Sequence, residues 1–273
     1  MNGNTMLSVS VVVAIRKAAR TLPQCLAALE RLDPAPAEIL LVDNGSTDGS
    51  LPLIRAFARE HAAEDVRVLE EPRRGATFAR NTGIWAAKGD VIAFTDSDCA
   101  PHSGWLGHLT EPFVDPTVGA VAGRVVPASA ASTVELLSTL YTLQLPDQPA
   151  RQRQWTPWKG GYPTANLAVR HALLKDLGGF DEGLPGGEDY DLCARLYARG
   201  AELAYVPKAA VAHHHRVTLS GMLHQAFRFG RNHPLLLARH ARRGLWVSLP
   251  GRPLAWSRCP VRAWVDLAPA DKK

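Results

Sequence analysis

The sequence contains two acidic clusters whose residue types and spacing suit metal binding and acid–base chemistry. In the first, Asp96 and Asp98 are separated by one residue and follow a predicted buried strand, residues 91–95. Side chains two positions apart on an extended chain point to the same side, so both carboxylates can contact one Mn²⁺ or Mg²⁺ ion. Such triplets are also common in turns, but charges placed directly after a buried strand are costly without a partner. We therefore predict that Asp96 and Asp98 bind a divalent metal.

The second acidic cluster is Glu188-Asp189, which follows Gly186-Gly187 and opens a predicted helix. Carboxylates in the first turn of a helix can cap it and interact with its dipole, and at least one of Glu188, Asp189 and Asp191 is expected to do so. The preceding glycines let backbone and carboxylates approach a substrate closely. A carboxylate at this position can also act as general base on an acceptor hydroxyl.

Three consecutive histidines occupy positions 213–215, after another predicted strand. Three adjacent side chains cannot converge on one ion without distorting the chain, which argues against an all-histidine zinc site. Alternation along the strand puts His213 on the same side as Val211, and a neutral imidazole is a competent metal ligand. His213 is therefore the third candidate metal ligand, with a solvated loop as the alternative.

Aromatic residues and glycines are interleaved over residues 155–162, which read WTPWKGGY. This segment can either stack against a sugar or acceptor ring or pack beneath a loop. Trp158, Gly161 and the nearby Asn166 are the candidate acceptor-binding residues.

The elements that must position these groups alternate between strands and helices in the first hundred residues. Apolar patterning predicts strands at residues 8–14, 38–42, 66–69 and 91–95, and helices at 21–32, 48–61 and 76–87. This alternation predicts a mostly parallel central sheet with helices on both faces. Ligands of such sheets bind beyond the carboxyl ends of the strands, where Arg16, Asp43, Asp48 and Asp96 would lie.

The remainder of the chain is less regular in its patterning. We expect an irregular, partly helical insertion at residues 111–164, helices at 167–177, 190–199 and 218–229, and a strand at 201–206. Gln225, Arg228 and Arg231 recur every three residues and predict one basic helix face. That face is either solvated or in contact with an anionic ligand.

Composition excludes several classes of protein. The 273 residues, 46% of them hydrophobic, can bury one substantial core. The four cysteines form no CxxC pair, which argues against a structural zinc site and against a disulfide framework. No stretch resembles a signal peptide or approaches the roughly 20 apolar residues needed to span a bilayer. These features predict a soluble, cytoplasmic protein.

Charge is distributed unevenly along the chain. Residues 1–207 carry 19 Lys or Arg and 24 Asp or Glu, a net charge of −5, whereas residues 208–273 carry 12 and 2, a net charge of +10. Trp246, Trp256 and Trp264 alternate with arginines in this tail, a combination that suits the inner face of a membrane. We expect weak peripheral membrane contact through the tail, with packing of these tryptophans on the domain as the alternative. No nucleic-acid-binding signature accompanies the charge, so no nucleic acid partner is expected.

Several segments together resemble family-2 glycosyltransferases of the GT-A fold, over about residues 8–232. The segments are VSVVVA, ILLVDNGSTDGS, RGATFARNTGIWAAKGDVIAFTDSDC and NLAVRHALLKDLGGFDEGLPGGEDYDLCARLYARG. The resemblance implies an α/β, Rossmann-like single domain at residues 1–217, followed by a basic, helical or irregular extension at 218–273. Within the domain it implies a nucleotide-binding half at about 1–100 and an acceptor-side half at about 101–217. It further implies an inverting enzyme that uses a metal ion and a nucleotide-sugar donor, most often UDP-linked, with a hydroxyl-type acceptor.

The resemblance also implies roles for individual residues. Asp189 matches the catalytic base and Glu188 is the second choice, while Asp98 is the principal metal ligand and Asp96 faces the ribose or the metal. The predicted nucleotide-sugar-binding residues are Ala14, Arg16, Asp43, Asp48, Gly75, Arg80, Asp96, Arg228 and Arg231. Family members commonly have a Pro-Thr-Tyr-Asn-like sequence after the first strand, where this chain has Ala-Ile-Arg-Lys, so the identity of the nucleotide stays open.

Two other functions fit parts of the same pattern. A nucleotidyltransferase acting on a sugar phosphate also combines an α/β sheet with metal-bound carboxylates, but its expected glycine-rich loop is missing from residues 14–19. A non-catalytic nucleotide-sugar-binding module is the third candidate. The presence of both Asp98 and Asp189 argues against it.

Overall fold

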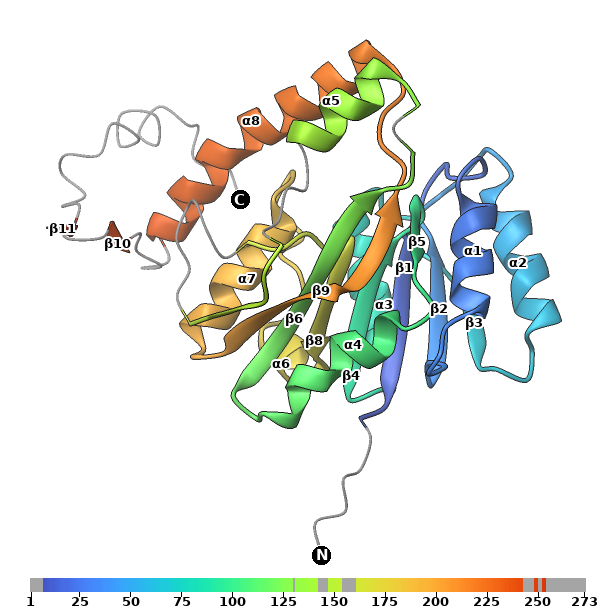
Figure 1. Cartoon of the computed structure of the whole chain (residues 1–273), viewed down its shortest axis with the longest axis horizontal. Coiled ribbons are helices and arrows are strands. Elements are labelled where there is room, and N and C mark those ends of the chain that lie inside the picture. The colour runs from blue at the N-terminus through green and yellow to red at the C-terminus, as the bar shows by residue number, and fades with distance from the viewer. Residues whose placement is uncertain are drawn as a thin grey trace, which may run out of the picture.

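A computed structural model describes residues 7–129, 131–141, 147–153, 161–242, 248–249 and 252–253. The described chain forms a nine-stranded sheet in the order β3-β2-β1-β4-β8-β6-β9-β5, with β7 paired to β9, covered by helices on both faces (Figure 1). Its strands are β1 (Val9–Ile15), β2 (Glu38–Asp43), β3 (Val66–Glu70), β4 (Val91–Asp96), β5 (Cys99–Pro101), β6 (Val118–Pro127), β7 (Ala150–Gln152), β8 (Asn166–Arg170) and β9 (Glu202–His213). The helices are α1 (Leu22–Glu30), α2 (Ser50–Glu60), α3 (Ala76–Ala86), α4 (Trp105–Thr110), α5 (Thr133–Tyr141), α6 (His171–Asp176), α7 (Glu188–Ala198), α8 (Leu219–Arg242) and the 3₁₀ helix η1 (Glu111–Val114). A separate two-stranded ribbon joins β10 (Ser248–Leu249) and β11 (Arg252–Pro253).

Because β1, β2 and β4 run in the same direction, the loops that follow them lie together at the carboxyl edge of the sheet. Strands β1, β2, β3, β4, β6 and β9 run one way, and β5, β7 and β8 run the other way. Central strand β1 pairs Ile15 with Asp43 of β2 and Ala14 with Asp96 of β4. The α/β fold with a mostly parallel sheet is thereby confirmed, and Asp43 and Asp96 lie at the carboxyl ends of strands on either side of β1.

Two apolar clusters hold the layers together, one on each face of the sheet. Val11 and Val13 of β1 belong to the cluster beneath α1, α2 and α4, whereas Val12 belongs to the cluster beneath α3, α6 and α7. All three valines have no exposed surface. Burying a side chain of this size contributes about 1.5–3 kcal/mol, so a strand buried on both faces anchors the sheet.

The prediction of an irregular insertion at residues 111–164 is wrong for residues 118–127, which form strand β6. The segment VGAVAGRVVP is rich in small residues, and this weakened its strand signal. The small residues are needed because neighbouring strands approach closely. A Cβ added at Gly123 would lie 2.0 Å from the backbone oxygen of Ala209 on β9.

Two further predictions need correction at their boundaries. Residues 166–170 form strand β8 between β4 and β6, so the predicted helix at 167–177 is confined to α6. The short apolar run LAV fits a helix and a strand equally well, and its pairing with β4 and β6 makes it a strand. Strand β9 also continues past Pro207 to His213. Pro207 has no N–H to donate, but the pairing of β9 with β6 shifts register between Val206 and Ala210, so no neighbouring strand needs that donor.

Helix α8 is longer than the predicted 218–229 and runs to Arg242 with Pro234 in its interior. It packs against α5, and the two helices lie together beyond the carboxyl edge of the sheet (Figure 1). Among the described residues, no helix combines the length and the apolar character needed to cross a membrane.

Candidate active site

The loops after β1 and β2 are joined through Asp48. Its Oδ2 accepts a hydrogen bond from the backbone N–H of Ala19 (3.0 Å), and its Oδ1 accepts from the backbone N–H and the hydroxyl of Ser50 (3.2 and 2.6 Å). These bonds, above all that of the Ser50 hydroxyl, lower the pKa of Asp48. Asp48 therefore shapes the nucleotide-side loops, and its contact with a ligand stays a prediction.

Asp43 offers an unused acceptor at the end of β2. Its side chain is buried, and its Oδ2 accepts from the backbone N–H groups of Gly45 and Ser46, both at 3.1 Å. Its Oδ1 is buried and has no hydrogen-bond partner among the described residues. Because an unpaired buried oxygen is costly, this geometry suits an N–H donor from a ligand, which is compatible with the predicted role of Asp43 in nucleotide-sugar binding.

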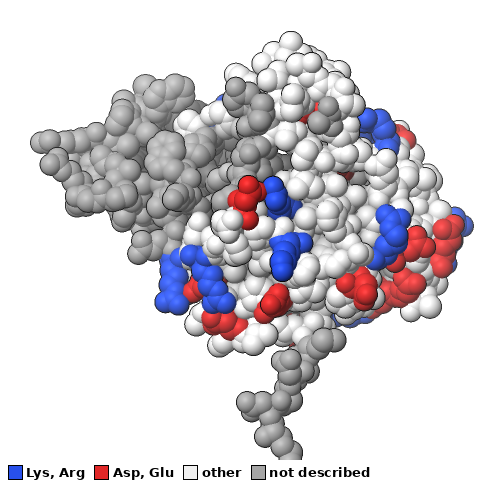
Figure 2. All heavy atoms as spheres, viewed as in Figure 1, with Lys and Arg blue, Asp and Glu red and all other residues white. Residues whose placement is uncertain are grey.

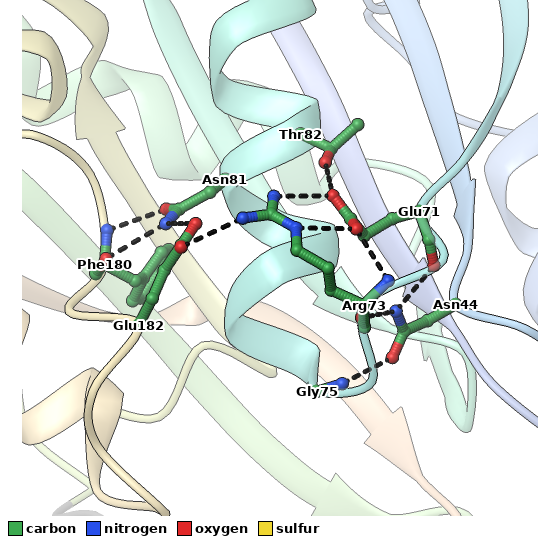
Figure 3. Close-up of polar contacts among 8 residues, drawn as sticks. All are labelled: Asn44, Glu71, Arg73, Gly75, Asn81, Thr82, Phe180 and Glu182. Carbon is green, nitrogen blue, oxygen red and sulfur yellow. Dashed lines mark hydrogen bonds and ion pairs between the residues drawn. The ribbon is translucent and has the colours of Figure 1, made fainter.

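Asn44 connects this loop to the loop that precedes α3 (Figure 3). Its amide nitrogen donates to the backbone oxygens of Glu71 (2.9 Å) and Arg73 (2.6 Å), and its Oδ1 accepts from the backbone N–H of Gly75 (2.8 Å). Gly75 directly precedes α3 as its N-cap residue, and it is one of the predicted nucleotide-sugar-binding residues. The structure places it against the Asn44 loop, and its contact with the donor stays a prediction.

A polar chain continues from the nucleotide side toward the segment before α7 (Figure 3). Arg73 donates to Glu71 through Nε (3.0 Å) and Nη2 (2.8 Å) and to Glu182 Oε2 through Nη1 (3.1 Å). The other oxygen of Glu182 accepts from Asn81 (3.1 Å), which also exchanges two hydrogen bonds with the backbone of Phe180. These contacts hold residues 180–182 next to α3.

Arg80 lies between the two acidic clusters. It is 6% exposed, and its guanidinium donates to Asp96 Oδ1 (2.8 Å) and to Glu188 Oε1 (2.9 Å). Burial alone would lower the pKa of Arg80, but the carboxylates of Asp96 and Glu188 outweigh it and raise the pKa. A permanently charged guanidinium thus fixes the predicted metal side and the predicted catalytic side relative to each other.

Strand pairing assembles the candidate metal site. Antiparallel pairing of β5 with β9 aligns Cys99 with His213, and His213 Nε2 then lies 3.6 Å from Asp98 Oδ1. One potential ligand atom from each of Asp98, Cys99 and His213 lies within 4.8 Å of the others. The 3.6 Å separation exceeds a hydrogen bond but allows both atoms to reach one ion.

The protonation states in this cluster favour a hard cation. Burial, followed by the charge of Asp96, raises the pKa of Asp98 to about 6, and burial lowers the pKa of His213 to about 4, so the imidazole is neutral. Burial also raises the pKa of the Cys99 thiol, so without a metal ion the thiol is protonated. His213 Nδ1 is buried and has no hydrogen-bond partner among the described residues. Carboxylate oxygen and imidazole nitrogen fit Mn²⁺ or Mg²⁺ better than a thiol would.

Asp189 has the properties of a general base. It follows Glu188 in the first turn of α7, and its Oδ1 accepts from the backbone N–H of Tyr190 (2.9 Å). Burial, and next the charge of Glu188, raises the pKa of Asp189 to about 7, although Arg80 opposes this shift. A carboxylate with a pKa near neutrality is ionised in about half of the molecules near pH 7, and it accepts a proton more readily than an ordinary carboxylate.

The acceptor-side predictions have different outcomes. Gly161 lies against the ring of Tyr190, since a Cβ at Gly161 would stand 2.1 Å from it, and it is therefore close to the candidate base. Its contact with an acceptor stays a prediction. Trp158 lies outside the described residues.

The structure places Asn166 in the core, and its predicted contact with an acceptor stays a prediction. Asn166 has no exposed surface. Its amide nitrogen donates to the backbone oxygens of Arg124 and Ala209, both at 2.8 Å, and its Oδ1 accepts from Trp105 Nε1 at 2.8 Å. The side chain ties β8 to β6, β9 and α4, and all three of these hydrogen bonds are made within the core.

The remaining predicted donor-binding residues are accessible. Ala14 is partly exposed at the end of β1, and Arg16, Arg228 and Arg231 are exposed. Their contacts with a donor stay predictions.

Helix α8 is anchored to the first turn of α7, and to the segment before it, by buried polar contacts. His240 Nε2 lies 3.0 Å from Asp191 Oδ1, and the other oxygen of Asp191 accepts from Arg195 Nε (2.6 Å). Asn232 donates to the backbone oxygen of Pro185 (3.3 Å). The residues that lead into Glu188 are therefore packed beneath α8.

Sequence reasoning missed most of these supporting residues. Glu71 and Arg73 follow the third strand, so the same edge-of-sheet argument that selected Asp43 could have found them. The partners Glu182 and His240 lie far along the chain and carried no local signal.

A hollow of about 710 Å³ lies at the opposite, amino end of β1. Its lining residues are 7–9, 34–37, 106–107, 110–111 and 113–114. Apolar residues and prolines predominate, and Glu111 is the one ionisable residue among them. This hollow holds none of the predicted site residues.

Comparisons with known proteins bear on the fold and on the family. A pre-mycofactocin glycosyltransferase of Mycobacterium tuberculosis is 34% identical over 262 residues, covering 93% of this chain and 53% of that protein. The chain thus spans about half the length of this curated relative. A mannosyltransferase, PcManGT, from Pyrobaculum calidifontis in complex with GDP-Man and Mn²⁺ has a TM-score of 0.69 at 24% identity, covering 88% of this chain and 65% of that one. GalNAc-T7 with UDP, GalNAc and Mn²⁺ has a TM-score of 0.60 at 21% identity, covering 78% and 45%.

These two structural likenesses support the fold. The model of the glycosyl transferase family 2 matches residues 10–178, more than half of the sequence. The matched residues include the loops after β1 and β2 and the Asp96–Asp98 pair. The chain therefore belongs to glycosyl transferase family 2.

Proposed function

We propose that this protein is an inverting glycosyltransferase that moves a sugar from a nucleotide diphosphate donor to an acceptor hydroxyl. The observation that carries the proposal is the double ion pair of Arg80 with Asp96 and Glu188. One buried cation holds the metal-side carboxylate beside the catalytic-side carboxylates, as transfer between a donor and an acceptor requires. Family membership and the relatives named above support the same activity.

Asp189 is the proposed general base. The acceptor oxygen attacks the anomeric carbon while the bond to the diphosphate oxygen breaks, and the acceptor proton passes to Asp189. Its pKa of about 7 suits this role, and Glu188, which is held by Arg80, is the second choice. No covalent bond to the enzyme forms, so the configuration at the anomeric carbon inverts.

Asp98, Asp96 and His213 are the proposed ligands of Mn²⁺ or Mg²⁺. When bound, such an ion supplies positive charge to the leaving diphosphate. Asp43, Asp48, Ala14, Arg16 and Gly75 form the proposed nucleotide side. UDP is proposed as the carrier, and GDP is the second choice because the mannosyltransferase relative is in complex with GDP-Man.

The name of the relative with 34% identity makes pre-mycofactocin the first acceptor to test. The test incubates the full chain with UDP- and GDP-sugars, Mn²⁺ and acceptor, and follows nucleotide diphosphate release together with the anomeric configuration of the product. Transfer with inversion is expected. Pyrophosphate release from a nucleoside triphosphate and a sugar phosphate would instead identify a nucleotidyltransferase. Tight donor binding without turnover would identify a binding module.

A further inference from the structure

The first half of α8 carries an apolar stripe on its solvent side. Leu219, Leu223 and Phe227 recur every four residues and are 54%, 57% and 66% exposed. Residues with this spacing lie along one face of a helix. Single exposed apolar residues are ordinary, whereas three large ones aligned on a helix mark a contact surface.

A basic flank runs beside this stripe. At about 100° per residue, His224, Arg228 and Arg231 fall within a sector of about 60° next to Phe227. All three are exposed, and the whole of α8 contains no Asp or Glu. The helix surface therefore has an apolar sector bordered by a positively charged sector.

The second half of α8 is fixed to the domain on the side opposite the stripe, so the helix cannot rotate to turn the stripe inward while that packing holds. Asn232, Leu236 and His240 are 5%, 1% and 1% exposed, and the polar pair contacts Pro185 and Asp191. The neighbouring helix α5 adds the half-exposed Leu136. In Figure 2 the face of the α5 and α8 lobe that is in view carries few Lys, Arg, Asp or Glu side chains; the colouring does not separate apolar from neutral polar residues, and the basic flank is not seen in this view.

We infer that the α8 surface, defined by the stripe Leu219, Leu223 and Phe227 and the basic flank His224, Arg228 and Arg231, docks on an anionic lipid bilayer. A helix with such sectors lies in the plane of the interface, its apolar side among the acyl chains and its arginines at the lipid phosphates. In this arrangement Arg228 and Arg231 contact lipid phosphates in place of the donor contact that the family resemblance implies. Pairing with a second copy is disfavoured, because an antiparallel symmetric contact through the stripe would bring two basic flanks together.

Docking through this surface has a consequence for the proposed reaction. Helix α8 covers the residues that lead into Glu188, so the bilayer would lie on the same side of the molecule as the first turn of α7, which carries the proposed base. An acceptor presented at a membrane surface would then be within reach of the site. Vesicle binding needs no sugar donor, so it can be tested whether or not the proposed transfer activity holds.

The experiment is co-sedimentation of the full chain with two kinds of vesicle, phosphatidylcholine alone and phosphatidylcholine mixed with phosphatidylglycerol. Wild type should bind the mixed vesicles, and more strongly at low salt. Leu223→Gln with Phe227→Gln should lower the partition coefficient at least about tenfold, because two large apolar side chains no longer insert. Arg228→Gln with Arg231→Gln should lower it by about tenfold for the anionic vesicles and much less for the neutral ones. The control is Leu53→Gln, which removes an exposed leucine from α2 on the other side of the molecule.

Unchanged vesicle binding by the Leu223/Phe227 variant, with thermal melts like those of wild type, would overturn the proposal. So would binding that is lost only when residues 244–273 are deleted, since the tail would then be the lipid contact. Sedimentation velocity without lipid tests the other alternative, in which a second copy of the chain binds the α8 surface. A dimer of wild type that the stripe variant dissociates, together with no vesicle binding, would assign the surface to a second copy and also overturn the proposal.

Discussion

Glu188 accepts a 2.9 Å hydrogen bond from Arg80, and the same guanidinium binds the carboxylate of Asp96 on its other side. The two acidic clusters of the sequence are thus held together by one buried cation. Their separation depends on the length and planar shape of that side chain, and this dependence leads to the first prediction.

Arg80→Lys should lower kcat/KM by about 100-fold, or about 3 kcal/mol of transition-state stabilisation, because an ammonium cannot span both carboxylates. The control is Arg67→Lys, which alters an arginine that is bound to Glu38 away from the site. Steady-state kinetics of both variants check the prediction. Equal activity of the two lysine variants would refute it.

Asp98→Asn should abolish the metal-dependent rise in melting temperature that a nucleotide diphosphate sugar produces. The variant without metal should be at least as stable as wild type, because burial and Asp96 both disfavour the charge of Asp98. Thermal melts with and without Mn²⁺ and donor measure both effects. A donor-induced shift that survives in the variant would exclude Asp98 as a metal ligand.

The activity should rise with pH up to the pKa of Asp189, about 7, and level off above it, because the base acts only when ionised. Asp189→Asn should keep donor binding and lose about 10²- to 10⁴-fold in kcat. Glu188→Gln should move the rising limb to lower pH, since the charge of Glu188 helps to raise the pKa of Asp189. The profile of kcat/KM against pH for the three proteins is the measurement. A limb that moves upward in Glu188→Gln would contradict the assignment.

Glu71 should make stability depend on acidity. Hydrogen bonds from Arg73, then Thr82, hold the pKa of Glu71 at about 2, below its ordinary 4.5. Because the pKa of Glu71 is lower in the folded state, the ionised side chain contributes fully to the free energy of unfolding above pH 4.5. This contribution is lost as the pH falls toward 2. Glu71→Gln should therefore be less stable by about 1–3 kcal/mol at neutral pH, with a flatter decline in acid. Urea melts at several pH values test this, and Glu70→Gln, an exposed neighbour, should change stability little.

Asn166→Ala should destabilise the fold rather than alter acceptor binding. It leaves two backbone oxygens and the Trp105 indole N–H without partners in the core, at a cost of about 3 kcal/mol. The melting temperature should fall by about 6–12 °C. Kinetics well below that temperature should give an unchanged KM for the acceptor. A raised KM with an unchanged melting temperature would support the original prediction for Asn166.

The local hydrophobic pattern was sufficient to predict the strands and helices in the first half of the domain. The strands and helices up to Asp96 match their predicted ranges within about two residues, because each is a strongly periodic segment bounded by turn residues. The same pattern failed for β6 and β8. These strands are short or rich in alanine and glycine, and their identity depends on the neighbours that they pair with.

The sequence by itself determined the family, the α/β fold and the acidic pairs Asp96–Asp98 and Glu188–Asp189, since these depend on residue type and local spacing. Only the tertiary structure decided that Arg80 joins the two pairs, that His213 stands beside Asp98 and that Asn166 is a core residue. Each of these depends on strands or helices that lie far apart in sequence. Such contacts arise from strand register and helix packing, which no short segment of the chain specifies.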